Sequence, residues 1–196
     1  MKKINILALG SSITKGYGNF NASYVEMLNE HNDETVKFEV YKEAVNGTCL
    51  ANRKADSYLA RVKKIDLNIL KTFNYALIQL STNDLHLFNN KYDLDNERTT
   101  FGAIVNIIEY LRKNSEAKIV FYTCFTKINN KYEDMIEKLK SLAAIYHFDV
   151  IDFYNDANMR NATFKKIMSD GIHPNKEGYI LMTKELIEYF KSNSKD

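Results

Sequence analysis

The chain has 196 residues, the length of one compact α/β domain, so we expect a single domain over residues 1–196. Its 27 basic and 25 acidic residues leave a formal charge of only +2, which argues against nucleic acid or an anionic membrane as a partner. No segment has the ~20 consecutive apolar residues that a membrane-spanning helix needs. These bounds point to a globular protein that acts on a small molecule.

The cysteine and histidine content argues against a disulfide framework or a metal site. Cys49 and Cys124 lie far apart in sequence, and the four histidines show no paired ligand spacing. The start of the chain resembles a signal peptide only weakly, because its apolar run is short and no cleavage site follows it. We therefore expect a cytoplasmic protein with reduced cysteines, no metal and no cofactor.

Apolar runs of strand length alternate with helical patterns along the whole chain. The predicted strands are Ile4–Leu9, Val36–Val45, Tyr75–Leu80, Ile119–Thr123 and Val150–Phe153. Apolar residues at helical spacing predict helices over Ser23–His31, Asp56–Leu70, Thr100–Lys113, Tyr132–Tyr146 and Lys176–Phe190. This alternation predicts a three-layer α/β/α sandwich around a flavodoxin-like, five-stranded parallel sheet with strand order 2-1-3-4-5.

Polar residues gather in the loops where such a sheet places its functional groups. Ligands of an open α/β sheet bind beyond the carboxyl ends of the strands. The polar segments expected there are Gly10–Thr14, Asn46–Thr48, Ser81–Asp84 and Asp170–Pro174. We expect these four loops to meet at one rim of the sheet.

Ser12 and the Asp170–His173 pair have the residue types of a nucleophilic site. A serine hydroxyl attacks well only when a base removes its proton, and an imidazole held by a carboxylate is such a base. By itself, Ser12 is more readily explained as a cap of the helix that follows, as are Ser11 and Thr14. The pair at Asp170 and His173 makes the nucleophilic interpretation the stronger one.

Asn83 and Gly47 supply the further groups that acyl transfer needs. The Asn83 side-chain amide and the Gly47 backbone N–H stand on loops expected to flank Ser12, where they could donate to an oxyanion. Each is also an ordinary turn former, so neither is specific alone. The combination of Ser12, Gly47, Asn83 and the Asp170–His173 pair, each in one of the four loops, indicates an acyl-transfer site more specifically than any one of them.

These segments resemble the four motif blocks of the SGNH (GDSL) hydrolase family across nearly the whole chain. Gly10–Thr14 is similar to its Gly-Asp-Ser-Ile/Leu-Thr block, Gly47 to its second-block glycine, Ser81–Asp84 to its Gly-x-Asn-Asp block, and Asp170–Pro174 to its Asp-x-x-His-Pro block. Two positions depart from the pattern, since Ser11 stands for the aspartate and Ser81 for the glycine.

The resemblance implies a serine esterase with Ser12, His173 and Asp170 as its triad. It also implies an oxyanion hole made of the Ser12 and Gly47 N–H groups and the Asn83 amide. Small acyl esters, including O-acetyl groups on carbohydrates, are the expected substrates. The polar segment Leu85–Asn96 is expected to lie over the site and to favour a carbohydrate.

Other functions stay open at this point. The same residues could transfer an acyl group to an alcohol, or the chain could be a catalytically silent binding domain. Flavin binding at the first loop would leave Asp170 and His173 without a role. His86 and Cys49 are weaker candidates for lining the site. The oligomeric state is not readable from the sequence.

Overall fold

In the computed structural model the chain forms an all-parallel five-stranded sheet in the order β2-β1-β3-β4-β5, which confirms the expected fold. The strands are β1 (Lys2–Gly10), β2 (Val36–Ala44), β3 (Tyr75–Gln79), β4 (Lys118–Tyr122) and β5 (Asp149–Ile151). The structure describes residues 1–31, 33–87, 93–126, 130–162 and 164–194.

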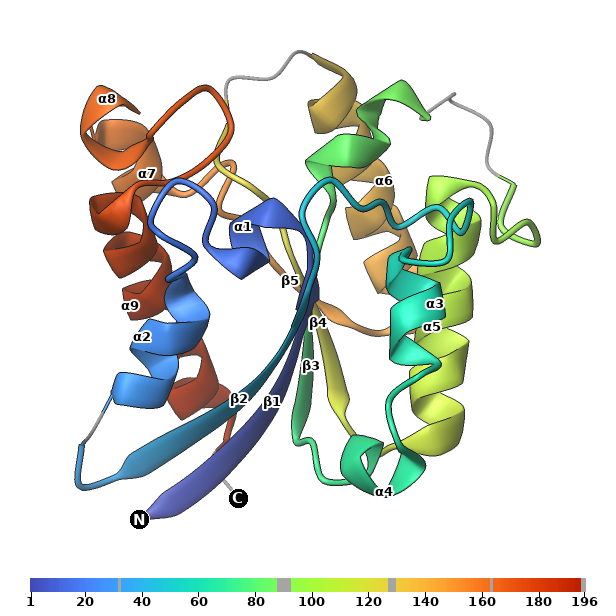
Figure 1. The fold of residues 1–196 in the computed structure, drawn as a ribbon, viewed down its shortest axis with the longest axis horizontal. Coiled ribbons are helices and arrows are strands. Elements are labelled where there is room, and N and C mark those ends of the chain that lie inside the picture. Colours follow the sequence, from blue (N-terminus) through green and yellow to red (C-terminus); the bar gives the residue numbers. More distant parts are fainter. Residues whose placement is uncertain (32, 88–92, 127–129, 163, 195–196) are drawn as a thin grey trace.

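Helices cover both faces of the sheet and complete the three layers (Figure 1). α2 (Tyr24–Glu30) and α9 (Lys176–Asn193) pack together on one face. α3 (Tyr58–Val62), α5 (Thr100–Asn114) and α6 (Asn130–Tyr146) lie on the other. Among the residues that the structure describes, no helix combines the length and apolarity that crossing a bilayer requires.

Apolar strand segments lie in the centre of the sheet because helices cover them on both sides. Every residue of β3 is buried, as are Ile6–Gly10 of β1. A strand covered on both faces has no side that favours polar residues, which explains the nearly continuous apolar runs of the sequence.

The helix predicted over Asp56–Leu70 is two helices, and this expectation was wrong. α3 ends at Val62, and α4 (Leu67–Leu70) begins after Asp66, whose side chain accepts from the Asn68 N–H at 2.8 Å. An aspartate that caps a new helix competes with continuation of the old one. Ile69 has the helical spacing of the buried Leu59 and Val62 but is 43% exposed.

The bounds of several short elements were not predicted. These elements are α1 (Ser12–Lys15), the 3-10 helix η1 (Thr82–His86), α7 (Ala157–Asn161) and α8 (Phe164–Ile167). Segments of four or five residues are too short for a helical repeat to show in the sequence. α1 and η1 begin directly beyond β1 and β3, so they carry two of the candidate site segments.

β2 forms one edge of the sheet and is partly covered by a side chain of α2. The Asn29 amide pairs with both backbone groups of Val40: Oδ1 accepts from the Val40 N–H at 2.8 Å, and Nδ2 donates to its carbonyl at 3.4 Å. This side chain therefore takes the place of a neighbouring strand at one position of the edge.

Candidate active site

The structure brings Ser12, His173 and Asp170 together at the carboxyl end of the sheet. His173 Nε2 lies 2.9 Å from Ser12 Oγ, although the two residues are 161 positions apart. His173 Nδ1 lies 2.8 Å from Asp170 Oδ2. Because a carboxylate only accepts, Nδ1 carries a proton, and Nε2 is left to accept the one from the Ser12 hydroxyl. The geometry is that of a serine prepared for deprotonation.

A tight turn holds Asp170 and His173 against each other. Asp170 Oδ1 accepts the backbone N–H groups of Ile172 and His173, both at 2.7 Å. Partial burial alone would raise the pKa of the Asp170 carboxyl, but the His173 side chain and these two N–H groups lower it below its ordinary value. The carboxylate therefore stays ionised beside the imidazole.

Ser12 begins the short helix α1, and the first block does not serve as a side-chain cap. Ser11 is the N-cap residue but makes no side-chain capping bond, and its buried hydroxyl has no hydrogen-bond partner among the described residues. Thr14 Oγ1 instead bonds to Gln79 Oε1 at 2.9 Å and to Tyr122 OH at 2.7 Å. Ser12 Oγ faces His173, so the capping interpretation was wrong for all three residues.

Gln79 fixes the position of α1 over the sheet. This fully buried side chain on β3 accepts the Ser11 N–H at 2.9 Å through the same oxygen that binds Thr14. A buried amide oxygen that accepts from two neighbouring groups restrains both. The residues on both sides of Ser12 in the sequence are therefore anchored to the buried Gln79 side chain.

The two loops expected to flank Ser12 are joined through the Thr48 carbonyl. Asn83 Nδ2 donates to this oxygen at 3.0 Å, and Ser81 Oγ donates to it at 3.3 Å. One of the two Asn83 amide hydrogens remains for another acceptor. Gly47 has a φ of 72°, a left-handed conformation that favours glycine. Gly47 and Asn83 are thus linked by one residue, Thr48.

Ser81, one of the two departures from the family pattern, is buried and has a structural role here. Besides its bond to Thr48, its hydroxyl accepts the Asn83 N–H at 3.1 Å and caps η1. The hydroxyl is turned to backbone groups of these two loops. Ser81 therefore links the Asn83 loop to the Gly47 loop.

Asp84 holds the same two loops from inside the molecule. Its fully buried carboxylate accepts the Leu50 N–H at 2.8 Å, the Ala51 N–H at 3.0 Å and the Thr100 hydroxyl at 3.0 Å. Burial raises the pKa of Asp84, and the two N–H groups oppose this rise. Asp84 thus fixes the chain just beyond Gly47 to the base of η1.

Arg61 connects the ends of β1 and β2 with the loop that carries Gly47, a role that was not predicted from the sequence. It is 6% exposed. Nη2 donates to the Gly10 carbonyl at 2.7 Å and lies 3.3 Å from Thr48 Oγ1. Nη1 donates to the Glu43 carbonyl at 2.7 Å and contacts its carboxylate at 3.2 Å, and Nε donates to the Asp56 carbonyl at 2.9 Å. One guanidinium therefore binds residues within two positions of both Ser12 and Gly47.

A pocket of about 280 Å³ adjoins the Gly47 loop, and both weaker candidates line it. Cys49 and His86 lie there with Gly47, together with Arg53 and Lys54. Burial raises the pKa of the Cys49 thiol to about 12, and the nearby Asp84 carboxylate adds to this. Cys49 is therefore a thiol that lines the pocket rather than a nucleophile. The segment Leu85–Asn96 lies partly outside the described residues.

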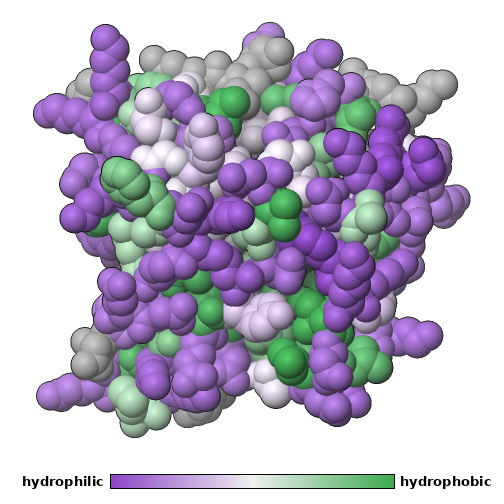
Figure 2. Space-filling model, viewed as in Figure 1, coloured by the Kyte–Doolittle hydropathy of each residue, from purple (hydrophilic) through white to green (hydrophobic). Residues whose placement is uncertain are grey.

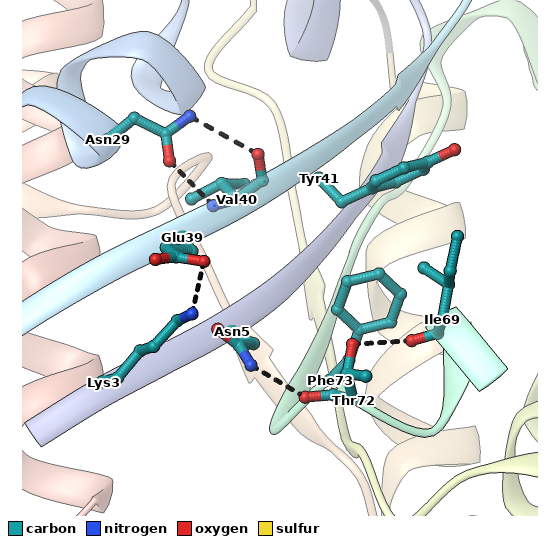
Figure 3. Close-up of a pocket in the computed structure, with 9 residues that line it drawn as sticks. All are labelled: Lys3, Asn5, Asn29, Glu39, Val40, Tyr41, Ile69, Thr72 and Phe73. Atoms are coloured by element: carbon teal, nitrogen blue, oxygen red, sulfur yellow. Dashed lines mark hydrogen bonds and ion pairs between the residues drawn. The ribbon is translucent and has the colours of Figure 1, made fainter.

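A larger pocket, of about 420 Å³, lies elsewhere, at the amino-terminal half of β1 and the middle of β2 (Figure 3). Its lining includes the Lys3–Glu39 ion pair, with 2.6 Å between Nζ and Oε2, and the contacting rings of Tyr41 and Phe73. Figure 2 shows a mainly hydrophilic surface with apolar side chains gathered in its lower middle. None of the predicted site residues lines this pocket.

Within the described ranges, no three histidine, cysteine, aspartate or glutamate side chains are grouped as metal ligands would be. The polar groups around Ser12 can instead hold a proton, orient an imidazole and donate to an anion. Arg61, Gln79 and Tyr17, whose ring lies against His173, were not predicted. Their partners are distant in sequence, so no local pattern reveals them.

Comparison with known proteins gives a consistent result. The model of the GDSL-like lipase/acylhydrolase family matches residues 8–181. No curated protein matches the chain.

Solved structures of three bacterial proteins are similar over nearly the whole chain. A lipase/acylhydrolase from Enterococcus faecalis is 18% identical with a TM-score of 0.70, covering 96% of each chain. A lipolytic protein of the G-D-S-L family from Veillonella parvula is 20% identical with a TM-score of 0.69, covering 96% of this chain and 98% of that one. A GDSL-like lipase from Bacteroides thetaiotaomicron is 17% identical with a TM-score of 0.66, covering 96% and 88%. At these identities the likeness establishes a shared fold.

Proposed function

Because the chain belongs to the GDSL-like lipase/acylhydrolase family and is thus an ester hydrolase of the SGNH type, we propose that it cleaves small carboxylic esters with Ser12 as nucleophile. The observation that supports this assignment is the continuous contact from Ser12 Oγ through the His173 ring to the Asp170 carboxylate, at 2.9 and 2.8 Å.

The proposed reaction has two half-reactions. His173 Nε2 takes the Ser12 proton as Oγ attacks the carbonyl carbon, and the imidazolium then gives that proton to the leaving alcohol. Water repeats the sequence on the acyl-enzyme and releases the acid. Asp170 holds the ring and stabilises its positive charge. The Ser12 and Gly47 N–H groups and the free Asn83 amide hydrogen are the proposed oxyanion donors.

We propose a short, polar acyl ester as the substrate, with O-acetylated carbohydrates as the leading class. The pocket beside Gly47 supports a polar substrate portion, because charged and amide side chains line it beside the apolar Ala51 and Leu87. The polar side chains are those of Asn46, Arg53, Lys54, Asp56 and His86. A long hydrocarbon chain would desolvate these groups without replacing their hydrogen bonds. Acetate release from acetylated sugars, compared with esters of increasing chain length, tests the proposal; faster turnover of long chains would contradict it.

The nucleophile is tested by two neighbouring serines. Ser12→Ala should lower the turnover of p-nitrophenyl acetate by about 10³-fold or more. Ser11→Ala is the matched control, because its hydroxyl is buried without a hydrogen-bond partner in the described structure. A fluorophosphonate should label the wild type and Ser11→Ala but not Ser12→Ala. Equal activity in Ser12→Ala would refute the assignment.

Turnover and labelling measurements also distinguish two alternative functions, an acyltransferase and a catalytically silent binding domain. Transfer of the acyl group to an added alcohol, in preference to water, would identify an acyltransferase with the same residues. Failure of wild-type Ser12 to label would favour a catalytically silent binding domain. The single-domain organisation, the cytoplasmic location and the lack of cofactor, nucleic-acid and membrane partners stay predictions from the sequence.

A further inference from the structure

The loop after α1 presents a tyrosine ring beside the candidate site. Tyr17 is 50% exposed, and its ring centroid lies 4.5 Å from that of His173 with the ring planes tilted by 53°. A half-exposed aromatic ring is available to a ligand on the side that the imidazole does not cover. The loop therefore offers an apolar surface next to a polar site.

Hydrogen bonds and close packing hold the backbone around Tyr17 beside the candidate site. The Tyr17 N–H donates to the Ser12 carbonyl at 2.9 Å. The Tyr179 hydroxyl of α9 lies 3.0 Å from the Ile13 carbonyl and 3.1 Å from the Tyr17 carbonyl, and its one hydrogen is shared between them. Gly18 has a φ of 91°, and a Cβ there would lie 2.5 Å from Ser169 Oγ and 2.7 Å from the Pro174 carbonyl oxygen. The loop is thus packed closely against the turn that carries His173.

The proton path defines which part of an ester lies near Tyr17. In the proposed reaction the bond between the acyl carbon and the alcohol oxygen breaks, and His173 Nε2 gives its proton to that oxygen. The alcohol portion must therefore lie within reach of His173, whereas the carbonyl oxygen lies at the Gly47 and Asn83 donors. A ring packed on His173 is on the alcohol side.

We infer that Tyr17 is a specificity-determining residue for the alcohol portion of the ester, and that it favours alcohols that present a flat face of C–H groups, as a pyranose or another six-membered ring does. This inference rests on the proposed function. An aromatic ring packs against such a face over a larger area than against a flexible chain, which also loses more rotamer freedom on binding.

The test compares two acetates whose alcohols have the same number of carbons and similar acidity. Cyclohexylmethyl acetate presents a ring and n-heptyl acetate presents a chain, so the chemical step is matched. The measured quantity is the ratio of their kcat/KM values. We expect wild type to prefer the ring ester and Tyr17→Ala to lower this ratio by about 2- to 10-fold, mainly through KM, while Tyr17→Phe keeps it.

A second pair of acetates separates a sugar from a hydrocarbon ring. Methyl 6-O-acetyl-glucopyranoside presents a pyranose face, whereas 1-O-acetylsorbitol is an acyclic polyol. The same loss of ring preference in Tyr17→Ala identifies the pyranose as a ligand of this surface. Loss of preference for the cyclohexyl ester alone limits the ligand to hydrocarbon rings.

Phe20 provides the matched control, because it is a fully exposed aromatic residue on the same loop. Phe20→Ala should leave both ratios unchanged. A uniform loss of activity in Tyr17→Ala with an unchanged ratio would mean that the ring only positions His173, and would overturn the inference. Hydrolysis of none of the esters by wild type would instead refute the proposed function, and the inference with it.

Discussion

Replacing Arg61 should destabilise the fold and also reduce activity, because one buried side chain holds two loops of the candidate site. Arg61→Met keeps most of the aliphatic stem and removes all the N–H donors. The Gly10 carbonyl then keeps only the longer bond from the Val45 N–H, at 3.4 Å, and the Glu43 carbonyl loses a 2.7 Å bond. The Asp56 carbonyl belongs to an exposed residue, so water can replace its bond.

The expected loss of stability follows from these bonds. A hydrogen bond to a charged group contributes about 1.5–3 kcal/mol. With one buried and one half-buried carbonyl affected, we expect the free energy of unfolding to fall by about 2–4 kcal/mol. For a chain of this size that lowers Tm by roughly 4–16 °C.

The conservative variant Arg61→Lys separates geometry from charge. Lysine keeps the positive charge but cannot form the guanidinium fork that binds Gly10 and Glu43 together. Loss of one oxyanion donor costs about 10²–10³ in kcat, so a displaced loop should cost less, about 10- to 100-fold. We expect this loss in kcat for ester hydrolysis, with little change in KM, in a protein that is still folded at the assay temperature.

Thermal unfolding and ester turnover should be measured for both variants, with Arg112→Met as the control. Arg112 is exposed on α5 and binds backbone carbonyls at the end of α6, so its loss should change stability by less than about 0.5 kcal/mol. Wild-type Tm and wild-type kcat in Arg61→Lys would refute the reasoning, since the guanidinium would then hold neither loop.

Three further predictions concern the groups around Ser12. Asp84→Ala leaves the Leu50 and Ala51 N–H groups without their acceptor, and urea unfolding should show a loss of about 2–5 kcal/mol; a loss below 1 kcal/mol would mean that water replaces the carboxylate. Asn83→Ala should lower kcat for p-nitrophenyl acetate by about 10²-fold with KM nearly unchanged, and a change confined to KM would contradict its role as an oxyanion donor. The pKa of Asp170 is lowered in the folded protein, so its carboxylate stabilises the fold above the ordinary aspartate pKa of about 4, and this contribution is lost as the pH falls below that value. Asp170→Asn should therefore be less stable than wild type at pH 7, with a difference that shrinks at pH 3 in urea titrations; a constant difference would contradict the linkage.

The sheet could be predicted from the sequence because its strands are nearly continuous apolar runs. Ile6–Leu9 and Tyr75–Gln79 are buried on both faces, so local composition alone identifies them. The four polar loops could be identified for the same reason, since each follows a strand or precedes a helix that the pattern reveals. The prediction of one helix over Asp56–Leu70 was wrong because Asp66 caps a new helix, although the amphipathic pattern continues through Asp66.

The supporting residues of the candidate site could not be predicted in this way. Gln79 looks like the last residue of a strand, yet its oxygen accepts from Ser11 and Thr14, more than 60 positions earlier. Arg61 looks like a charged residue on a helix surface and is buried against Gly10, 51 positions away. Such contacts follow from tertiary packing, which a single sequence does not reveal.

The pairing of Asn29 with the edge strand β2 has a consequence for how the protein behaves at high concentration. An open edge invites strands of other molecules to extend the sheet, which is a first step toward aggregates. With the N–H and carbonyl of Val40 already bonded to one amide, a foreign strand would meet a break midway along this nine-residue edge. Asn29 thus opposes the addition of a strand from another molecule at β2, far from the candidate active site around Ser12.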